Sequence, residues 1–143
     1  ASEFEKIHAI LRFSALPGAS RHHWGTDFDV YDPSQLNHGQ TLQLEPWEYE
    51  PNGPFFKLSQ WLNDNLSSLD FAQPYNRDVG GIAIEPWHIS FTPVASTYEH
   101  TLTQHVLHHC LAQSDILGKM TILANLPELF ERYVLNKGLQ HVN

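Results

Sequence analysis

The chain has one cysteine, few basic residues and no long apolar segment, and each shortage excludes a class of protein. Cys110 stands alone among 143 residues, which excludes an internal disulfide and a zinc cluster built from cysteines. The chain has 8 Lys and Arg residues and 16 Asp and Glu residues, and the resulting formal net charge of −8 would repel a nucleic-acid backbone. The apolar runs, such as the one around 81–84, are far shorter than the ~20 residues of a membrane span. We therefore expect no nucleic-acid partner and no membrane span.

What the chain does contain is enough apolar material for one core, together with a large number of histidines. Hydrophobic residues make up 41% of the chain and charged residues 17%. Because average soluble domains carry roughly 25% charged residues, this composition argues against a disordered chain. The length predicts a single domain over residues 1–143. The ten histidines suggest a metal site, which only their spacing can decide.

Apolar residues recur at helical spacing in several stretches, and shorter stretches alternate as strands do. Helices are predicted at residues 3–12, 55–69, 96–112, 115–121 and 126–135, and strands at 26–31, 80–84 and 88–92. The loop-rich stretch 32–54 allows one hairpin at 41–50. In the first strand, alternation places Phe28 and Val30 on the core side and Asp27 and Asp29 on the polar side. This order of elements predicts an α+β fold with a small antiparallel sheet flanked by helices.

Two interruptions of the predicted strands carry side chains of the kind that bind metals. His22 lies in a loop before the first strand and Asp29 lies on that strand, and Gly25 supplies the bend that lets both reach one point. In the second interruption a proline, which cannot continue a central strand, separates Glu85 from His88 and turns both side chains toward one cavity. Two such breaks together are a more specific signal than either one alone.

Two imidazoles and one carboxylate form the ligand set of a catalytic zinc ion with an open fourth position. Such an ion lowers the pKa of a bound water molecule toward ~7, and a carboxylate outside the ligand set can move the water's proton to a leaving amine. His22, Asp29 and His88 suit the first role, and Glu85 suits the second. The spacing also leaves open a structural interpretation, in which the carboxylates are surface residues and the histidines are packed ones.

The residues from Ser20 to Asp29 resemble the Ser-x-His-x-x-Gly-x-Ala-x-Asp motif of a family of zinc peptidases. This is the D-alanyl-D-alanine carboxypeptidase and dipeptidase family (VanY and VanX-like, peptidase family M15), whose zinc core is shared with hedgehog domains. The residues Glu85-Pro86-Trp87-His88 resemble the Glu-x-Trp-His motif of the same family. Both motifs occur in the expected order, with an aromatic-rich helix at 55–66 between them, and the resemblance covers roughly residues 15–95.

The resemblance implies that zinc is the cofactor, with His22, Asp29 and His88 as its ligands and Glu85 as the general base. It also implies that Ser20 helps to hold the substrate near the metal. The tryptophan of the second motif, Trp87, either contacts the substrate or is a core aromatic residue that shapes the strand break. The fold of the family, a small antiparallel sheet flanked by helices, agrees with the predicted order of elements.

The sequence departs from the family pattern in two places. Asp27 occupies the position of the family's alanine, and it either hydrogen-bonds a ligand histidine or competes with Asp29 for the metal. The motif register favours Asp29 as the ligand. Relatives also carry an upstream segment with an arginine that helps to hold the substrate, and only 19 residues precede the first motif, so we expect that segment to be missing. Either the chain is a fragment of a longer protein, or Arg12, Arg21 or Arg77 takes over the role of binding an anionic group.

Two other patterns imitate metal sites. Glu45-Pro46-Trp47-Glu48 has the spacing of the second motif but places a glutamate where the ligand histidine should be, so we interpret it as a loop whose aromatic residue covers the cleft. His105, His108 and His109 lie at helical spacing, but no glutamate follows His105 as in the His-Glu-x-x-His pattern. We interpret these three histidines as an ordinary helix face.

The leading hypothesis is a zinc D,D-carboxypeptidase that hydrolyses D-Ala-D-Ala-type termini of peptidoglycan stem peptides with a metal-bound water assisted by Glu85. A non-catalytic domain stabilised by zinc is the alternative from another class, and a dipeptidase, an L,D-carboxypeptidase and an endopeptidase are alternatives within the enzyme class. The substrate implied by the resemblance predicts a periplasmic or extracellular protein, although the chain shows no targeting signal. The oligomeric state cannot be read from the sequence.

Overall fold

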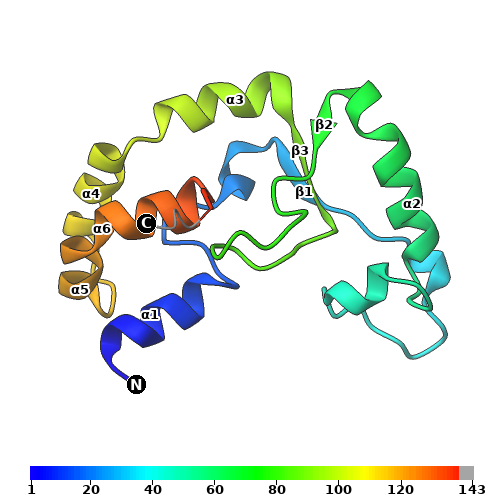
Figure 1. Cartoon of the computed structure of the whole chain (residues 1–143), viewed down its shortest axis with the longest axis horizontal. Coiled ribbons are helices and arrows are strands. Elements are labelled where there is room, and N and C mark those ends of the chain that lie inside the picture. Colours follow the sequence, from blue (N-terminus) through cyan, green and yellow to red (C-terminus); the bar gives the residue numbers. More distant parts are fainter. Residues whose placement is uncertain (139–143) are drawn as a thin grey trace, which may run out of the picture.

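A three-stranded antiparallel sheet lies at the centre of the computed structural model, which describes residues 1–138 (Figure 1). The strands are β1 (Asp27–Asp29), β2 (Phe71–Ala72) and β3 (His88–Phe91), in the order β1-β3-β2. In the pairing of β1 with β3, Asp29 lies opposite His88 and Asp27 lies opposite Ser90. The predicted α+β fold with a small antiparallel sheet is therefore confirmed.

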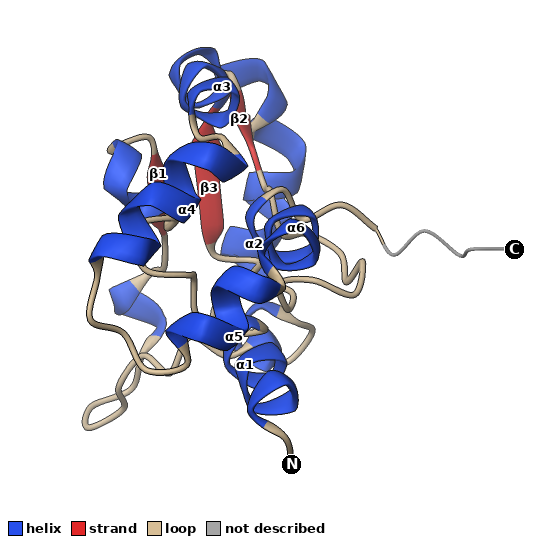
Figure 2. Cartoon of the chain, turned by 90° about the vertical axis from the view of Figure 1, so that its left-hand side faces the viewer, coloured by secondary structure: helices blue, strands red, loops and turns tan. Residues whose placement is uncertain are grey.

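Helices lie on both sides of this sheet. The C-terminal helices pack with α1 on one side, and α2 and the stretch 32–54 lie on the other (Figures 1 and 2). The α-helices are α1 (Glu3–Leu11), α2 (Phe56–Asn65), α3 (Thr92–Thr101), α4 (Gln104–Gln113), α5 (Lys119–Ala124) and α6 (Leu126–Leu129). Short 3₁₀ turns are η1 (Arg21–Trp24), η2 (Pro33–Gln35), η3 (Pro46–Tyr49) and η4 (Ser67–Leu69), and the π-helical turn η5 (Phe130–Val134) follows α6. None of the helices in the described residues is long and apolar enough to cross a membrane.

Two separate groups of buried apolar side chains support the sheet from its two sides. The larger group joins α1 to the C-terminal helices and includes Leu11, Leu107 and Leu126, which are at most 4% exposed. The smaller group consists of Tyr49, Phe55 and Trp87, with leucines of the stretch 32–54 packed against it. Because Trp87 directly precedes β3, the smaller core fixes the entry of the chain into the central strand.

The hairpin predicted at 41–50 is wrong, because this stretch folds around a buried carboxylate. Glu48 is 1% exposed, and its side chain accepts hydrogen bonds from the backbone N–H groups of Gln43 (3.2 Å) and Glu45 (2.9 Å). The Tyr49 hydroxyl donates to the Val30 carbonyl at 2.7 Å and ties the stretch to the end of β1. These bonds satisfy backbone groups that a hairpin would have paired with each other.

The strand predicted at 80–84 is also wrong. The Ile82 N–H donates to the side chain of Asn136 (3.0 Å), and the Ala83 N–H donates to the carbonyl of Arg12 (2.9 Å). Segments from the two ends of the chain therefore take the place of a neighbouring strand. The predicted helix 96–112 is likewise divided into α3 and α4, because Thr103 accepts a hydrogen bond from the Val106 N–H and begins a new helix.

The side of β1 expected to face the core is the opposite of the one observed. Phe28 is 49% exposed, whereas Asp27 is only 4% exposed. The carboxylate of Asp27, which is paired with Arg21, lies on the buried side of the strand, where the alternation pattern predicts apolar side chains. The buried face of β1 is therefore polar, and it lies beside the candidate site.

Replacing Gly81 with alanine should destabilise the protein, because its Cβ would overlap the backbone carbonyl oxygen of Arg132. Overpacking of this kind costs about 1–3 kcal/mol. Gly138→Ala is the matched control, because a Cβ there would meet the nearest atom, in Val79, at an ordinary 3.9 Å. Urea unfolding of both variants measures the difference, and equal free energies of unfolding would contradict the packing described for residues 80–84.

Candidate metal centre

The turn η1 delivers His22 to the site. Ser20 begins this turn, and its hydroxyl accepts a hydrogen bond from the His22 backbone N–H at 3.3 Å. Gly25 ends it in the left-handed region (φ 69°), a conformation that glycine adopts without steric cost. The chain then enters β1, so that His22 and Asp29 approach each other across the bend as predicted.

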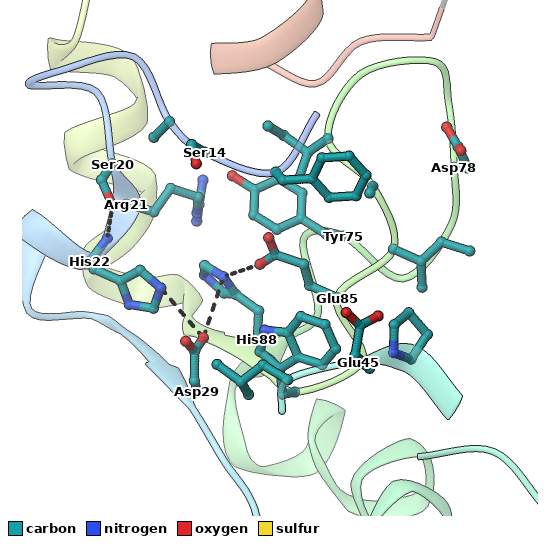
Figure 3. Close-up of a pocket in the computed structure, with 18 residues that line it drawn as sticks. Ser14, Ser20, Arg21, His22, Asp29, Glu45, Tyr75, Asp78, Glu85 and His88 are labelled. Atoms are coloured by element: carbon teal, nitrogen blue, oxygen red, sulfur yellow. Dashed lines mark hydrogen bonds and ion pairs between the residues drawn. The ribbon is translucent and has the colours of Figure 1, made fainter. Parts of the chain in front are cut away.

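The second motif forms a tight turn in front of β3. The His88 N–H donates to the Glu85 carbonyl at 3.2 Å, and the Val30 N–H donates to the Trp87 carbonyl at 3.0 Å. This turn directs both the Glu85 and the His88 side chains into one cavity (Figure 3). Trp87 itself is 7% exposed in the smaller core, and it also lines the cavity wall.

The side chains of His22, Asp29 and His88 meet in this cavity (Figure 3). Each offers a ligand atom, and these atoms lie within 4.8 Å of one another. Asp29 Oδ1 is 3.4 Å from His22 Nε2 and 3.8 Å from His88 Nδ1. Across residues 1–138 this is the one group of three or more histidine, cysteine, aspartate or glutamate side chains found at such spacing, and His105, His108 and His109 of α4 are not part of it.

Asp27 determines which nitrogen each histidine presents to the cavity. Its backbone carbonyl lies 3.2 Å from His22 Nδ1, and its carboxylate lies 2.6 Å from His88 Nε2. The backbone carbonyl and the carboxylate of Asp27 can only accept hydrogen bonds. His22 Nδ1 and His88 Nε2 therefore each carry a proton and donate it to Asp27. His22 Nε2 and His88 Nδ1 are thereby directed toward Asp29, as metal ligands are oriented by the groups behind them.

The Asp27 carboxylate is itself held by a buried polar network. It accepts hydrogen bonds from Arg21 Nε (2.7 Å), from the Ser90 hydroxyl (2.8 Å) and from the Thr26 hydroxyl (2.8 Å). Burial alone would raise the pKa of Asp27, but the hydrogen bonds from His88, Arg21 and Thr26 outweigh burial and hold this pKa well below its usual range. Asp27 is therefore a permanent anion beneath the site.

Protonation of the cluster follows from these contacts. Burial by itself would lower the pKa of His88, but the hydrogen bonds to Asp27 and Glu85 raise it to about 8. Burial also raises the pKa of Asp29, where nearby Glu85 and Asp27 add to the effect and the two histidines oppose it. The carboxylates of Asp29, Glu85 and Asp27 lie close together, and His88 holds its proton beside them. Such a site favours a cation, and a bound metal ion would take the place of that proton.

The cavity above the cluster has a volume of about 690 Å³, and most of the charged side chains that line it are carboxylates. Glu85 Oε2 lies 3.0 Å from His88 Nδ1, and Glu45 lies on the opposite side from Ser20 (Figure 3). The Tyr75 ring packs edge-on against His88, with ring centroids 5.0 Å apart, and burial raises the pKa of its hydroxyl. Sequence reasoning missed Tyr75, because no motif or spacing marks it.

Comparison with known proteins adds to this geometry. The model of the D-alanyl-D-alanine carboxypeptidase (VanY) family matches residues 1–94, which is more than half of the chain. The chain belongs to this family. An uncharacterized protein of Haemophilus influenzae is 42% identical over 125 residues, which cover 84% of this chain and 93% of that protein. No solved structure matches the chain.

The part of the chain that matches the VanY family contains every residue of the cluster. Residues 1–94 extend from α1 through β3, and the helices from α4 onward lie beyond the match. The resemblance drawn from the two motifs is thereby confirmed. Asp27 replaces an alanine of the family motif, and of the two roles considered for it the geometry supports the hydrogen bond to a histidine.

The arginines considered as anion-binding residues are differently placed. Arg21 lines the cavity, but its three guanidinium nitrogens hydrogen-bond Asp27, Glu99 and Ser90. Arg12 forms two hydrogen bonds with the Asp78 carboxylate, at 2.6 and 2.9 Å. Arg77 is exposed and is not among the residues that line this cavity in the described part of the chain. The geometry thus gives Arg21 the role of positioning Asp27.

Replacing Asp27 with alanine should lower the free energy of unfolding by about 3–5 kcal/mol, because it removes the fully buried anion that Arg21 and His88 share. Asp29→Ala is the matched control two residues along the same strand. Its loss should cost less than about 1 kcal/mol, because ionised Asp29 is disfavoured by burial and by its carboxylate neighbours.

Urea unfolding with a chelator present measures both variants without a contribution from metal binding. If the two variants lost equal stability, the account of Asp27 as the buried anchor would be wrong.

Proposed function

We propose that this member of the VanY family is a zinc-dependent D,D-carboxypeptidase that hydrolyses D-Ala-D-Ala-type termini of peptidoglycan stem peptides. The observation that carries the proposal is the convergence of His22 Nε2, His88 Nδ1 and Asp29 beside Glu85, a carboxylate outside the ligand set. A stem-peptide substrate would place the protein in the periplasm or outside the cell.

The donor set fits zinc. Two imidazole nitrogens and one carboxylate are typical of catalytic zinc sites that keep one position open. Because His22 Nδ1 and His88 Nε2 donate to Asp27, His22 Nε2 and His88 Nδ1 are the nitrogens left for the ion, which would displace the proton that His88 Nδ1 shares with Glu85. When bound, zinc would polarise the scissile carbonyl and lower the pKa of a water molecule. The histidines and Asp29 supply the ligands for that ion.

In the proposed reaction Glu85 moves the protons. Its carboxylate lies at the cavity wall, 3.0 Å from His88 Nδ1, and it has no part in the three-ligand group. In this position it would take a proton from the attacking water and return it to the leaving amine, as a general base and then a general acid. Ser20, at the start of η1, lines the same cavity and lies within reach of a bound peptide.

A second candidate is cleavage of an internal bond in the same class of substrate. A carboxypeptidase must bind the free carboxylate at the end of its substrate. Among the described lining residues Arg21 is the one arginine or lysine, and its nitrogens are already hydrogen-bonded to Asp27, Glu99 and Ser90. This arrangement favours an endopeptidase, for which no terminal carboxylate enters the cavity.

Replacing Glu85 with glutamine should lower kcat by about 10²–10⁴-fold while one zinc ion per chain is retained, because the ligands remain and the proton acceptor is lost. Glu45→Gln is the matched control, since Glu45 begins the other Glu-Pro-Trp sequence and lines the same cavity. We expect this control to keep most of the activity.

The assay measures release of D-Ala from a D-Ala-D-Ala-terminated stem peptide, beside cleavage of an internal bond in a longer stem peptide. Activity retained by Glu85→Gln would contradict its assignment as the base. Bound zinc without hydrolysis of either peptide would favour the non-catalytic alternative.

A further inference from the structure

A second cavity lies in the stretch 32–54, which is cyan in Figure 1 and packs near α2. Its volume is about 510 Å³, within the range of ~300–1,000 Å³ that is common for small-ligand sites. What distinguishes its lining is the number of side-chain amides, which belong to Gln35, Asn37, Gln40, Gln43 and Asn52.

The lining is polar but carries almost no accessible charge. Glu48 is the one charged residue among the described lining residues, and it is 1% exposed with both carboxylate oxygens bound to backbone N–H groups. A primary amide offers two donors and one acceptor in a plane. The cavity therefore suits a neutral ligand with many hydroxyl or amide groups, and it offers little to an anion or a cation.

Trp47 gives this cavity an aromatic wall. The side chain is 50% exposed, although tryptophan has the largest apolar surface of all residues. Its backbone is held firmly, because Glu48 closes the turn η3 and Gly53 packs so closely that a Cβ there would overlap the carbonyl oxygen of Trp47. Because the backbone is held, only the two side-chain torsions of Trp47 lose freedom when a ligand covers the ring.

The second cavity adjoins the metal centre along the chain. Glu45 and Pro46 line the cavity above His22 and His88, and the next two residues, Trp47 and Glu48, line the second cavity. One turn, η3, therefore forms a wall of both. A polymer with a reactive branch in the first cavity would extend past this turn into the second.

We propose that the second cavity binds the amino-sugar backbone of a glycan strand, the part of peptidoglycan to which the stem peptide is attached. The apolar face of a sugar ring packs on Trp47, and the hydroxyl and N-acetyl groups hydrogen-bond the side-chain amides of the lining. The inference rests on the proposed function, and it narrows the substrate from a free stem peptide to one still linked to its glycan.

Binding of a β-1,4-linked tetramer of N-acetylglucosamine to the zinc-loaded full chain tests the site by calorimetry. We expect saturable binding that weakens about tenfold in Trp47→Ala, because an aromatic anchor at the centre of a site carries at least about 1.4 kcal/mol of affinity. Trp61→Ala is the matched control, since Trp61 is 51% exposed on α2 and lines neither cavity. This control should bind as the unchanged chain does.

A second measurement compares hydrolysis of a stem peptide linked to a disaccharide with hydrolysis of the same peptide alone. Trp47→Ala should lower kcat/KM for the linked peptide several-fold relative to the free one, and Trp61→Ala should leave the ratio unchanged. No tetramer binding by the unchanged chain, or equal losses on both peptides in Trp47→Ala, would overturn the inference. Tetramer binding that depends on Trp47, without hydrolysis of either peptide, would support the sugar site and contradict the proposed function.

Discussion

The buried carboxylate of Asp27 is the group on which the rest of the site depends. The Asp27 carboxylate accepts hydrogen bonds from His88, Arg21 and Ser90. The backbone carbonyl of the same residue accepts one from His22. A buried charge is costly unless it is paired and fully hydrogen-bonded, and here each of its oxygens has partners. The hydrogen bond from His88 that helps to make the burial of the carboxylate tolerable also directs His88 Nδ1 toward Asp29.

The sheet is small, yet it is sufficient to bring the two motifs together. The antiparallel register places Asp29 directly opposite His88, and the turn before β3 adds Glu85 to the same cavity. Two apolar cores hold the sheet from its two sides, and the stretch 32–54 joins the smaller core through Tyr49. The residues of the proposed sugar site are thus carried on a segment that is held by the buried Glu48 carboxylate, apart from the metal cluster.

The sequence could predict features that depend on neighbours along the chain, such as the helix at 3–12, the bend at Gly25 and the irregular backbone at Pro86 before β3. Two features that depend on distant partners were predicted wrongly. Residues 80–84 were expected to pair as a strand, but Asn136 and Arg12 take their hydrogen bonds. The buried face of β1 was misassigned because alternation cannot show that Arg21 and His88 would neutralise Asp27.

The most direct test of the central claim is a crystal structure of the zinc-loaded protein with anomalous scattering recorded at the zinc edge. The account predicts one zinc ion bound by His22 Nε2, His88 Nδ1 and the Asp29 carboxylate, with Asp27 still hydrogen-bonded to His88 Nε2. A zinc ion bound by the Asp27 carboxylate, or located only at the histidines of α4, would contradict it.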